Sequence, residues 1–211
     1  MMAEMKMSDF LDRLSSPAPV PGGGGVCAYA AALGMSLGSM VANLTTGKKK
    51  YAEHEEEIRE ILKKAAVVTK GLASCMDKDA EAFEPLAKAY GLPKNTPEEI
   101  EQRTEVMENA LCAAGEAPLA LMKEILEALL LLSRLSVIGS RLAISDVGVG
   151  VQLCKAALNG ASLNVYINTK FMKNRRIAED MNKRAKEMAQ RGSKMADEIF
   201  EEVAGTLCGK K

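Results

Sequence analysis

The stretch Val26–Thr46 constrains this chain more than any other, because it contains no charged side chain and is rich in Ala, Gly and Ser. A helix that is apolar or small on every side belongs at the centre of a bundle. Ser36, Ser39 and Asn43 interrupt a run that otherwise looks like a membrane span. We therefore expect a buried central helix in a soluble protein without membrane contact.

The rest of the chain also predicts helices. Ala, Leu and Met are abundant, aromatic residues make up 4%, and no segment alternates like a strand. Pro85 and Pro118 are expected to bend the helices that contain them. We predict an all-α, single-domain bundle over residues 1–211, with a central small-residue helix and long antiparallel helices. The expected helices are Met5–Leu14, Val26–Thr46, Glu55–Ala89, Thr96–Leu132, Leu142–Leu158 (ended by Asn159-Gly160), Ala161–Met172 and Ile177–Val203.

Composition argues against several classes of protein. Lys and Arg number 28 and Asp and Glu number 28, so no net charge attracts a nucleic acid. The five cysteines form no CxxC pair, and the first ten residues lack an apolar signal core, which favours reduced thiols in the cytoplasm. With a single histidine, His54, we expect neither a metal site nor a Ser-His-Asp triad.

Two aspartates lie where the helical period calls for apolar residues. Asp79 continues the apolar stripe of the helix at 55–89, and a carboxylate buried there is costly unless it is paired or shifted in pKa. It is either half of an ion pair with a neighbouring helix or an active-site acid or base. Asp146, beside Ser145, either lies in the first turn of a helix, near its cap, or stands mid-helix on an apolar face.

Three asparagines and two loop segments are further candidates for a functional site, and most of them also have a purely structural interpretation. Asn164 and Asn168 share a helix face, where they either bind a heterocycle or are exposed to solvent. Asn43 lies in the apolar helix, where a buried amide needs partners. The run Gly22–Gly25 either cradles an anion at a helix start or is a flexible connection. The run Lys48–Lys50 either pairs with a helix dipole or meets a ligand carboxylate.

Taken in chain order, these blocks resemble the cyclodeaminase/cyclohydrolase family. Its members include the C-terminal domain of formiminotransferase-cyclodeaminase and stand-alone methenyltetrahydrofolate cyclohydrolases. The proline and glycine run joined to a small-residue helix is the most specific block, and the likeness covers nearly the whole chain. This chain departs from the pattern in having a fourth glycine. The matching blocks are Pro19–Gly25, Met40–Thr45, Lys48–Tyr51, Asp79–Phe83, Ser145–Val147 and Gly160–Asn168.

The resemblance implies a helical, usually dimeric enzyme that acts on a tetrahydrofolate derivative, with or without a polyglutamate tail, and needs no other cofactor. Without an attached formiminotransferase domain, hydrolysis of 5,10-methenyltetrahydrofolate to 10-formyltetrahydrofolate is the expected reaction. The alternative is a formimidoyltetrahydrofolate cyclodeaminase, which releases ammonia. An alternative of another class is a non-catalytic helical assembly module.

The resemblance also implies roles for particular residues. A buried carboxylate would stabilise the methenyl cation and steer water, with Asp79 as first choice and Asp146 as second. Lys48 or Tyr51 would protonate the leaving nitrogen or the developing oxygen. The expected substrate-binding residues are Pro21, Gly22, Gly23, Gly24, Asn43, Lys49, Ser145, Asn164 and Asn168, with Lys49 or Lys50 meeting glutamate carboxylates.

Overall fold

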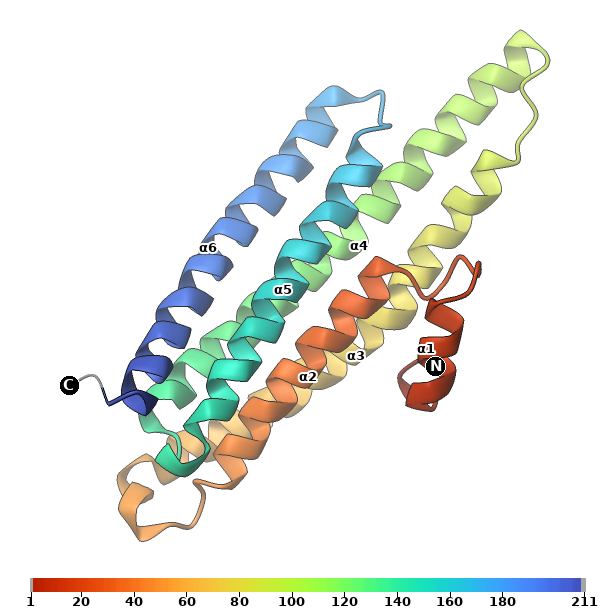
Figure 1. Cartoon of the computed structure of the whole chain (residues 1–211). Coiled ribbons are helices and arrows are strands. Elements are labelled where there is room, and N and C mark those ends of the chain that lie inside the picture. Colours follow the sequence, from red (N-terminus) through yellow and green to blue (C-terminus); the bar gives the residue numbers. More distant parts are fainter. Residues whose placement is uncertain (1, 210–211) are drawn as a thin grey trace.

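The structure, a computed structural model, describes residues 2–209 and contains no strand within that range. Five long helices and one short one account for most of it (Figure 1). The α-helices are α1 (Met7–Leu14), α2 (Gly23–Asn43), α3 (Glu55–Tyr90), α4 (Pro97–Ile138), α5 (Ile144–Thr169) and α6 (Arg175–Leu207). Three short 3₁₀ segments complete the order: η1 (Met2–Glu4), η2 (Lys49–His54) and η3 (Arg141–Ala143).

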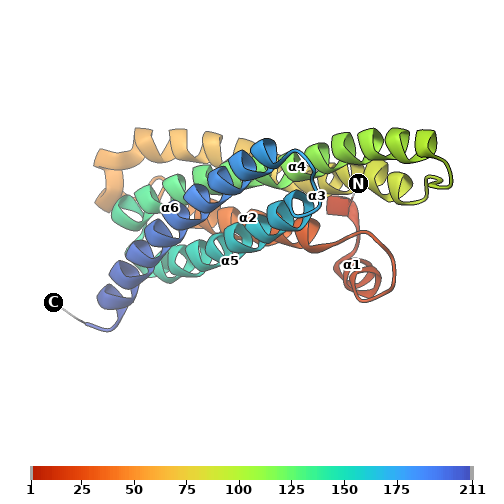
Figure 2. The same cartoon turned by 90° about the horizontal axis from the view of Figure 1, so that it is seen from above.

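Helices α2, α3, α4 and α5 form a four-helix bundle, and α6 packs along α4 and α5. Figure 2 shows α2 and α5 side by side in one layer and α3 and α4 in another. Helices α3 and α4 extend past the N-terminal end of α2 (Figure 1). This difference in length leaves room for a pocket at that end of the bundle.

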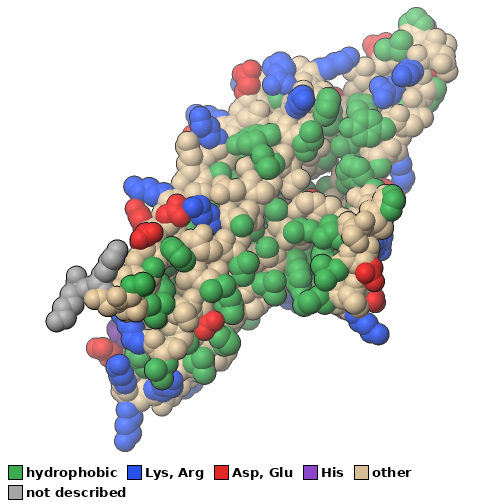
Figure 3. Space-filling model, viewed as in Figure 1, with side chains coloured by type: hydrophobic (Ala, Val, Ile, Leu, Met, Phe, Trp, Pro, Cys, Tyr) green, Lys and Arg blue, Asp and Glu red, His purple; other side chains and the backbone are tan. Residues whose placement is uncertain are grey.

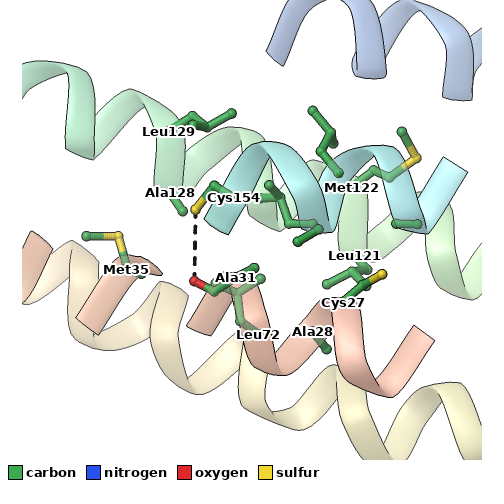
Figure 4. Close-up of a cluster of buried hydrophobic side chains, with 14 of the residues drawn as sticks. Cys27, Ala28, Ala31, Met35, Leu72, Leu121, Met122, Ala128, Leu129 and Cys154 are labelled. Carbon is green, nitrogen blue, oxygen red and sulfur yellow. Dashed lines mark hydrogen bonds between the residues drawn. The ribbon is translucent and has the colours of Figure 1, made fainter. Parts of the chain in front are cut away.

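The core is built from aliphatic side chains and from small residues that let helices approach. Met35, Leu72 and Leu129 come together from α2, α3 and α4 (Figure 4), and all three are fully buried. Helices α2 and α5 approach each other backbone to backbone, because a Cβ at Gly34 would lie 2.7 Å from the carbonyl oxygen of Gly150. Small residues of α2 also admit other helices, since Gly24 faces Asp79 of α3 and Gly38 faces Leu132 of α4.

Local signals in the sequence set most of the helix ends. At the start of α4, the Thr96 hydroxyl accepts from the Glu99 amide, and Glu99 accepts from the Thr96 amide, which is a complete capping box. Both α3 and α4 run continuously through their prolines, Pro85 and Pro118.

The predicted break at Asn159-Gly160 is wrong, because α5 is one helix from Ile144 to Thr169. The glycine has a packing role instead of a breaking one. A Cβ at Gly160 would lie 2.6 Å from the Cys27 Sγ atom of α2. Helix α5 also contains Asp146 in its first turn, which decides between the two positions left open for that residue.

Helix α2 is less enclosed than an all-apolar helix predicts. It contacts α3, α4 and α5, but one side of it, including Leu33 and Met40, stays at the surface. Among residues 2–209 it is the one helix long and apolar enough to cross a membrane, and 50% of that segment is buried inside the bundle. Asn43, expected to be a buried amide, is exposed and donates only to the Ser39 carbonyl.

Candidate active site

A pocket of about 250 Å³ opens beside the N-terminal end of α2, on the face shown in Figure 3. The segment before α2 forms one wall, and α3, α4 and α5 form the others. Figure 3 shows the hollow there, bordered mainly by hydrophobic side chains. The lining residues are Pro19, Val20, Gly22, Gly23, Gly24, Asp79, Phe83, Leu86, Tyr90, Ala114, Asn164, Ile167, Asn168 and Phe171.

The glycine run makes room for the polar groups of this pocket. A Cβ at Gly24 would overlap the Asp79 carboxylate, and a Cβ at Gly23 would lie 3.4 Å from the Asn164 Oδ1 atom. Gly23 and Gly24 form the first turn of α2, where backbone N–H groups have no partner within the helix. The run is therefore part of the site and not a flexible connection.

Asp79 is the one carboxylate that lines the pocket, and it is half-buried on α3. Burial raises the pKa of its carboxyl group above the usual value, and a hydrogen bond from the Gly25 backbone amide opposes that rise. No ion pair holds it among the described residues, so the interpretation of Asp79 as half of an interhelical ion pair is wrong. A carboxyl group with a raised pKa in a pocket is suited to accepting and returning a proton.

The thiol of Cys27, close to Asp79, is not suited to accepting a proton. Burial, with a smaller effect of the Asp79 charge, raises the pKa of Cys27 to about 11. Cys27 therefore stays a thiol near neutral pH, and the pocket has no thiolate nucleophile from this residue. Within residues 2–209 no three His, Cys, Asp or Glu side chains come together as metal ligands.

The two asparagines of α5 are held by backbone carbonyls. The Asn168 Nδ2 group donates to the carbonyl oxygens of Ala114, at 3.1 Å, and Asn164, at 2.8 Å. The Ala114 carbonyl is available because Pro118, four residues later in α4, has no N–H to pair with it. With its donors occupied, Asn168 offers its Oδ1 atom to a ligand as an acceptor. Sequence reasoning treated Pro118 only as a bend and missed this role.

Contacts from α1 and the residues around it hold the segment before α2 in place. The Arg13 Nε atom donates to the Val20 carbonyl at 2.9 Å, and Phe10 of α1 packs against Tyr29 of α2. Pro21 follows a cis peptide bond and is buried behind Gly25, so it supports the wall of the pocket but does not line it. This differs from the expectation that Pro21 itself contacts the substrate.

Aromatic rings complete the site. Phe83 and Tyr90 from α3 and Phe171 after α5 line the pocket, together with aliphatic side chains. Sequence reasoning included Phe83 in the block Asp79–Phe83 without giving it a contact with substrate, and it missed Tyr90 and Phe171. Flat walls, two amides and one carboxylate are suited to a planar heterocycle with mixed donors and acceptors and a positive centre.

The remaining candidates lie at the opposite end of the bundle, about 30 Å away if α2 rises by about 1.5 Å per residue. There the Lys48 Nζ atom lies 3.5 Å from the Ser140 Oγ atom, and Tyr51 accepts a hydrogen bond of 3.1 Å from the Arg141 amide. That amide hydrogen bond, with smaller effects of Ser140 and the neighbouring lysines, lowers the pKa of the Tyr51 hydroxyl. This cluster is exposed and basic.

One chain therefore brings together only part of the predicted set. Asp79, Asn164, Asn168 and Gly22–Gly24 line one pocket, as the resemblance implies for a single site. Six of the predicted residues do not line this pocket: Lys48, Lys49, Tyr51, Asn43, Ser145 and Asp146. Asn43 ends α2, and Asp146 begins α5, so both lie at the far end of the same antiparallel helix pair.

Fold and pocket together define an all-helical protein with a pocket lined by aromatic side chains, two amides and one carboxylate. Comparison with known proteins gives the family. A family model described as Formiminotransferase-cyclodeaminase matches residues 6–187, and the chain belongs to this family.

Two kinds of relative within the family are informative. A methenyltetrahydrofolate cyclohydrolase from Methylorubrum extorquens is 40% identical over 194 residues, which cover 92% of this chain and 93% of that protein. The formimidoyltransferase-cyclodeaminase of Rattus norvegicus is 32% identical over 171 residues, and the chain spans only 32% of its length. A solved formiminotetrahydrofolate cyclodeaminase from Thermotoga maritima superposes with a TM-score of 0.87 at 26% identity, over 98% of this chain and 100% of that one.

Proposed function

We propose that this chain is a methenyltetrahydrofolate cyclohydrolase, converting 5,10-methenyltetrahydrofolate to 10-formyltetrahydrofolate. The observation that carries the proposal is the pocket of Asp79, Asn164 and Asn168, because a carboxylate and two amides suit a pteridine with a cationic bridge. The cyclohydrolase from Methylorubrum extorquens supports it, because the alignment spans nearly all of both chains.

The proposed mechanism uses Asp79 as a proton shuttle. Its carboxylate faces the positively charged methenyl carbon and takes a proton from water as the water oxygen bonds to that carbon. The product is a neutral intermediate with a hydroxyl group on the carbon between N5 and N10. Asp79 returns its proton to N5, the C–N5 bond breaks, and the hydroxyl proton leaves to solvent. The formyl group stays on N10, and one proton is released overall.

The other pocket residues bind and orient the substrate in this proposal. Asn164 and Asn168 hydrogen-bond the pteridine, the aromatic residues Phe83 and Phe171 stack on it, and the glycine run packs against it. No cofactor besides the folate is required. Lys48, at Ser140, lies at the other end of the bundle, so within one chain Lys48–Lys50 are given no contact with the pteridine bound beside Asp79.

The proposal includes a homodimer in the cytoplasm. Free cysteines support a reducing compartment, since Cys27, Cys75 and Cys154 are buried thiols and Cys208 is an exposed one. The exposed apolar side of α2 and α5 supports association with a second copy.

The decisive test is an absorbance assay with 5,10-methenyltetrahydrofolate, whose loss is followed with and without the protein. We expect turnover well above the spontaneous rate, and a rise in the melting temperature of the protein with a reduced folate. Absence of both effects would overturn the proposal in favour of a non-catalytic helical module.

A cyclodeaminase is the second candidate, favoured by the TM-score of 0.87 against the Thermotoga maritima protein. Its reaction passes through the same kind of tetrahedral intermediate. The carbon between N5 and N10 carries an amino group there, where the cyclohydrolase intermediate carries a hydroxyl group. Release of ammonia from 5-formiminotetrahydrofolate, measured beside the absorbance assay, separates the two activities. Ammonia release that is faster than methenyl hydrolysis would assign the cyclodeaminase reaction.

A further inference from the structure

A second cavity, between α3 and α4, reaches the same Asp79 that lines the active-site pocket. Its volume is about 190 Å³, and we call it the back cavity. Of the described residues, Asp79 alone lines both spaces. The carboxylate that is proposed to move protons therefore stands between two separate spaces. The residues that line the back cavity are Gly71, Cys75, Lys78, Asp79, Ala117, Pro118, Ala120, Leu121 and Glu124.

The back cavity extends from a buried floor to the surface of the bundle. Cys75, Pro118 and Leu121 are buried, whereas Lys78 and Ala120 are exposed. Helices α3 and α4 form one layer of the bundle (Figure 2), so the cavity opens on the surface of that layer. Because the cavity and the pocket share no lining residue except Asp79, a ligand in the pocket leaves this opening uncovered.

Two carboxylates face the back cavity, about two helical turns apart. Glu124 of α4 lies opposite Gly71, where a Cβ would be 3.1 Å from the Glu124 Oε2 atom. Gly71, Cys75 and Asp79 follow one another at steps of four along α3, so Glu124 and Asp79 are separated by about 11 Å along the helix. The Glu124 carboxylate makes no hydrogen bond or ion pair with any described residue, which leaves both its oxygens free to bind water.

The ionisable groups around the back cavity lie close enough to influence one another. Burial raises the pKa of the Cys75 thiol; the Lys78 charge lowers that pKa by a smaller amount, and the charges of Glu124 and Asp79 add small rises. Cys75 therefore stays a thiol near neutral pH and does not exchange a proton there. Glu124 is the one carboxylate, besides Asp79, that faces the cavity from the described residues.

The back cavity has both the size and the polar groups to hold a short row of water molecules. One water takes up about 30 Å³ of liquid volume and needs about two to four polar partners. A cavity of about 190 Å³ with two carboxylates, an ammonium group and a thiol meets both conditions. The pocket offers no such path once it is filled, because its volume of about 250 Å³ lies below the usual range of about 300–1,000 Å³ for ligand sites.

We propose that the back cavity is the exit route for the proton of hydrolysis, through water held between Asp79 and Glu124, while the folate fills the pocket. The inference deepens the proposed cyclohydrolase reaction and rests on it for the chemistry. Hydrolysis consumes one water and releases one proton. Asp79 has become a carboxylate again after it protonates N5. It takes the hydroxyl proton as the C–N5 bond breaks and the formyl C=O bond forms, and it passes that proton to water in the back cavity.

Two properties of the residues suit them to this transfer. A carboxyl group can accept a proton on one oxygen and release it from the other, so Asp79 does not need to move between the two spaces. Glu124 orders the water at the far end of the cavity and passes the proton to solvent or buffer. Glu124 is thus a positioning residue for the water, whereas Asp79 contacts the substrate.

The first test needs no substrate. A high-resolution crystal structure of the wild-type protein should show ordered water in the back cavity between Asp79 and Glu124. Ala117→Leu, which extends a side chain into that space from α4, should displace the water. A dry cavity in the wild-type crystal would overturn the exit route whatever the activity.

The second test measures hydrolysis of 5,10-methenyltetrahydrofolate with the back cavity filled. Ala117 lines the cavity but not the pocket, so Ala117→Leu should lower kcat by about tenfold and leave KM nearly unchanged. The matched control is Ala113→Leu, at an exposed site one turn earlier in α4 that lines neither space, and its kcat should equal that of wild type. An unchanged kcat in Ala117→Leu, or a change confined to KM, would refute the exit route.

The third test separates proton transfer from packing. Glu124→Gln keeps the size of the side chain but cannot take up a proton, so kcat should fall by about tenfold in dilute buffer. Added imidazole should restore it above the rate without protein, because a small buffer accepts the proton at the opening of the cavity. Glu127→Gln, at an exposed site of α4, is the matched control and should respond to neither change.

Two results of this third test would contradict the proposal: a Glu124→Gln variant with normal kcat, or a loss that imidazole does not repair. The crystal structure and the assay also keep two kinds of failure apart. Inactive wild-type protein with a hydrated cavity would defeat the folate assignment, whereas active protein with a dry cavity would defeat only the exit route.

Discussion

At the scale of single residues, Asp79 has room for its carboxylate because Gly24, which packs against it, has no side chain. A side chain at Gly24 would occupy the space of the carboxylate, so the glycine run and the aspartate are parts of one feature. The sequence could suggest both, because a carboxylate on an apolar stripe and a glycine run before a helix are visible without coordinates. It could not show that they touch, since they are separated by more than fifty residues.

Asp79→Asn should abolish most of the hydrolysis of 5,10-methenyltetrahydrofolate. An amide neither accepts the proton of water nor balances the methenyl cation, so kcat should fall by about 10²- to 10⁴-fold. The matched control is Asp77→Asn on the same helix, where the carboxylate accepts only the Met2 backbone amide. Steady-state kinetics of both variants measure the effect, and equal rates for Asp79→Asn and Asp77→Asn would remove Asp79 from the mechanism.

The same substitution should change how stability depends on pH. Because burial raises the pKa of Asp79, the native protein holds this proton to a higher pH than the unfolded chain does. Between the two pKa values the native state binds more protons, so the free energy of unfolding falls as pH rises. Asp79→Asn should therefore resist urea better than wild type near pH 7.5, with a smaller difference below about pH 4. A difference that stays constant across this range would contradict the raised pKa.

At the scale of helices, the sequence predicted the elements better than their ends. The period of apolar residues and the capping signals at Thr96 located the long helices. The break placed at Gly160 failed because a glycine in a helix has two meanings: it can end a helix or admit a neighbour. Here the neighbour is Cys27 on α2. Only the packing of two helices distinguishes these meanings.

Pro118→Ala should weaken substrate binding while leaving the chemical step nearly intact. The new N–H would pair with the Ala114 carbonyl inside α4 and compete with the Asn168 amide that now binds it. Loss of about 1 kcal/mol of orientation corresponds to a rise in KM of about fivefold, with little change in kcat. Pro85→Ala is the control, because it restores an N–H in the exposed part of α3. A fall in kcat without a change in KM would count against this positioning role.

At the scale of the whole molecule, the sequence could predict a helical bundle but not the separation of its polar residues. Chain order places Lys48, Asp79 and Asp146 in neighbouring blocks, yet the antiparallel helices place Asp79 at one end and the other two at the opposite end. The apolar character of α2 likewise suggested a fully enclosed helix, because the sequence does not show which sides of α2 its neighbours cover. An apolar helix can leave one side at the surface, as α2 does at Leu33 and Met40, so composition alone cannot distinguish an enclosed helix from a half-exposed one.

The close approach of α2 and α5 requires that residue 150 have no side chain, which can be tested at Gly150. A Cβ at Gly150 would lie 2.8 Å from the Gly34 carbonyl oxygen, so Gly150→Ala must push the two helices apart. The overpacking costs about 1–3 kcal/mol, which outweighs the gain of up to about 1 kcal/mol from helix propensity. Gly205→Ala in α6 has no atom within 4 Å of its new Cβ and should gain stability instead. Urea unfolding of the two variants should therefore move in opposite directions, and a stabilised Gly150→Ala would mean that the α2–α5 contact is looser than described.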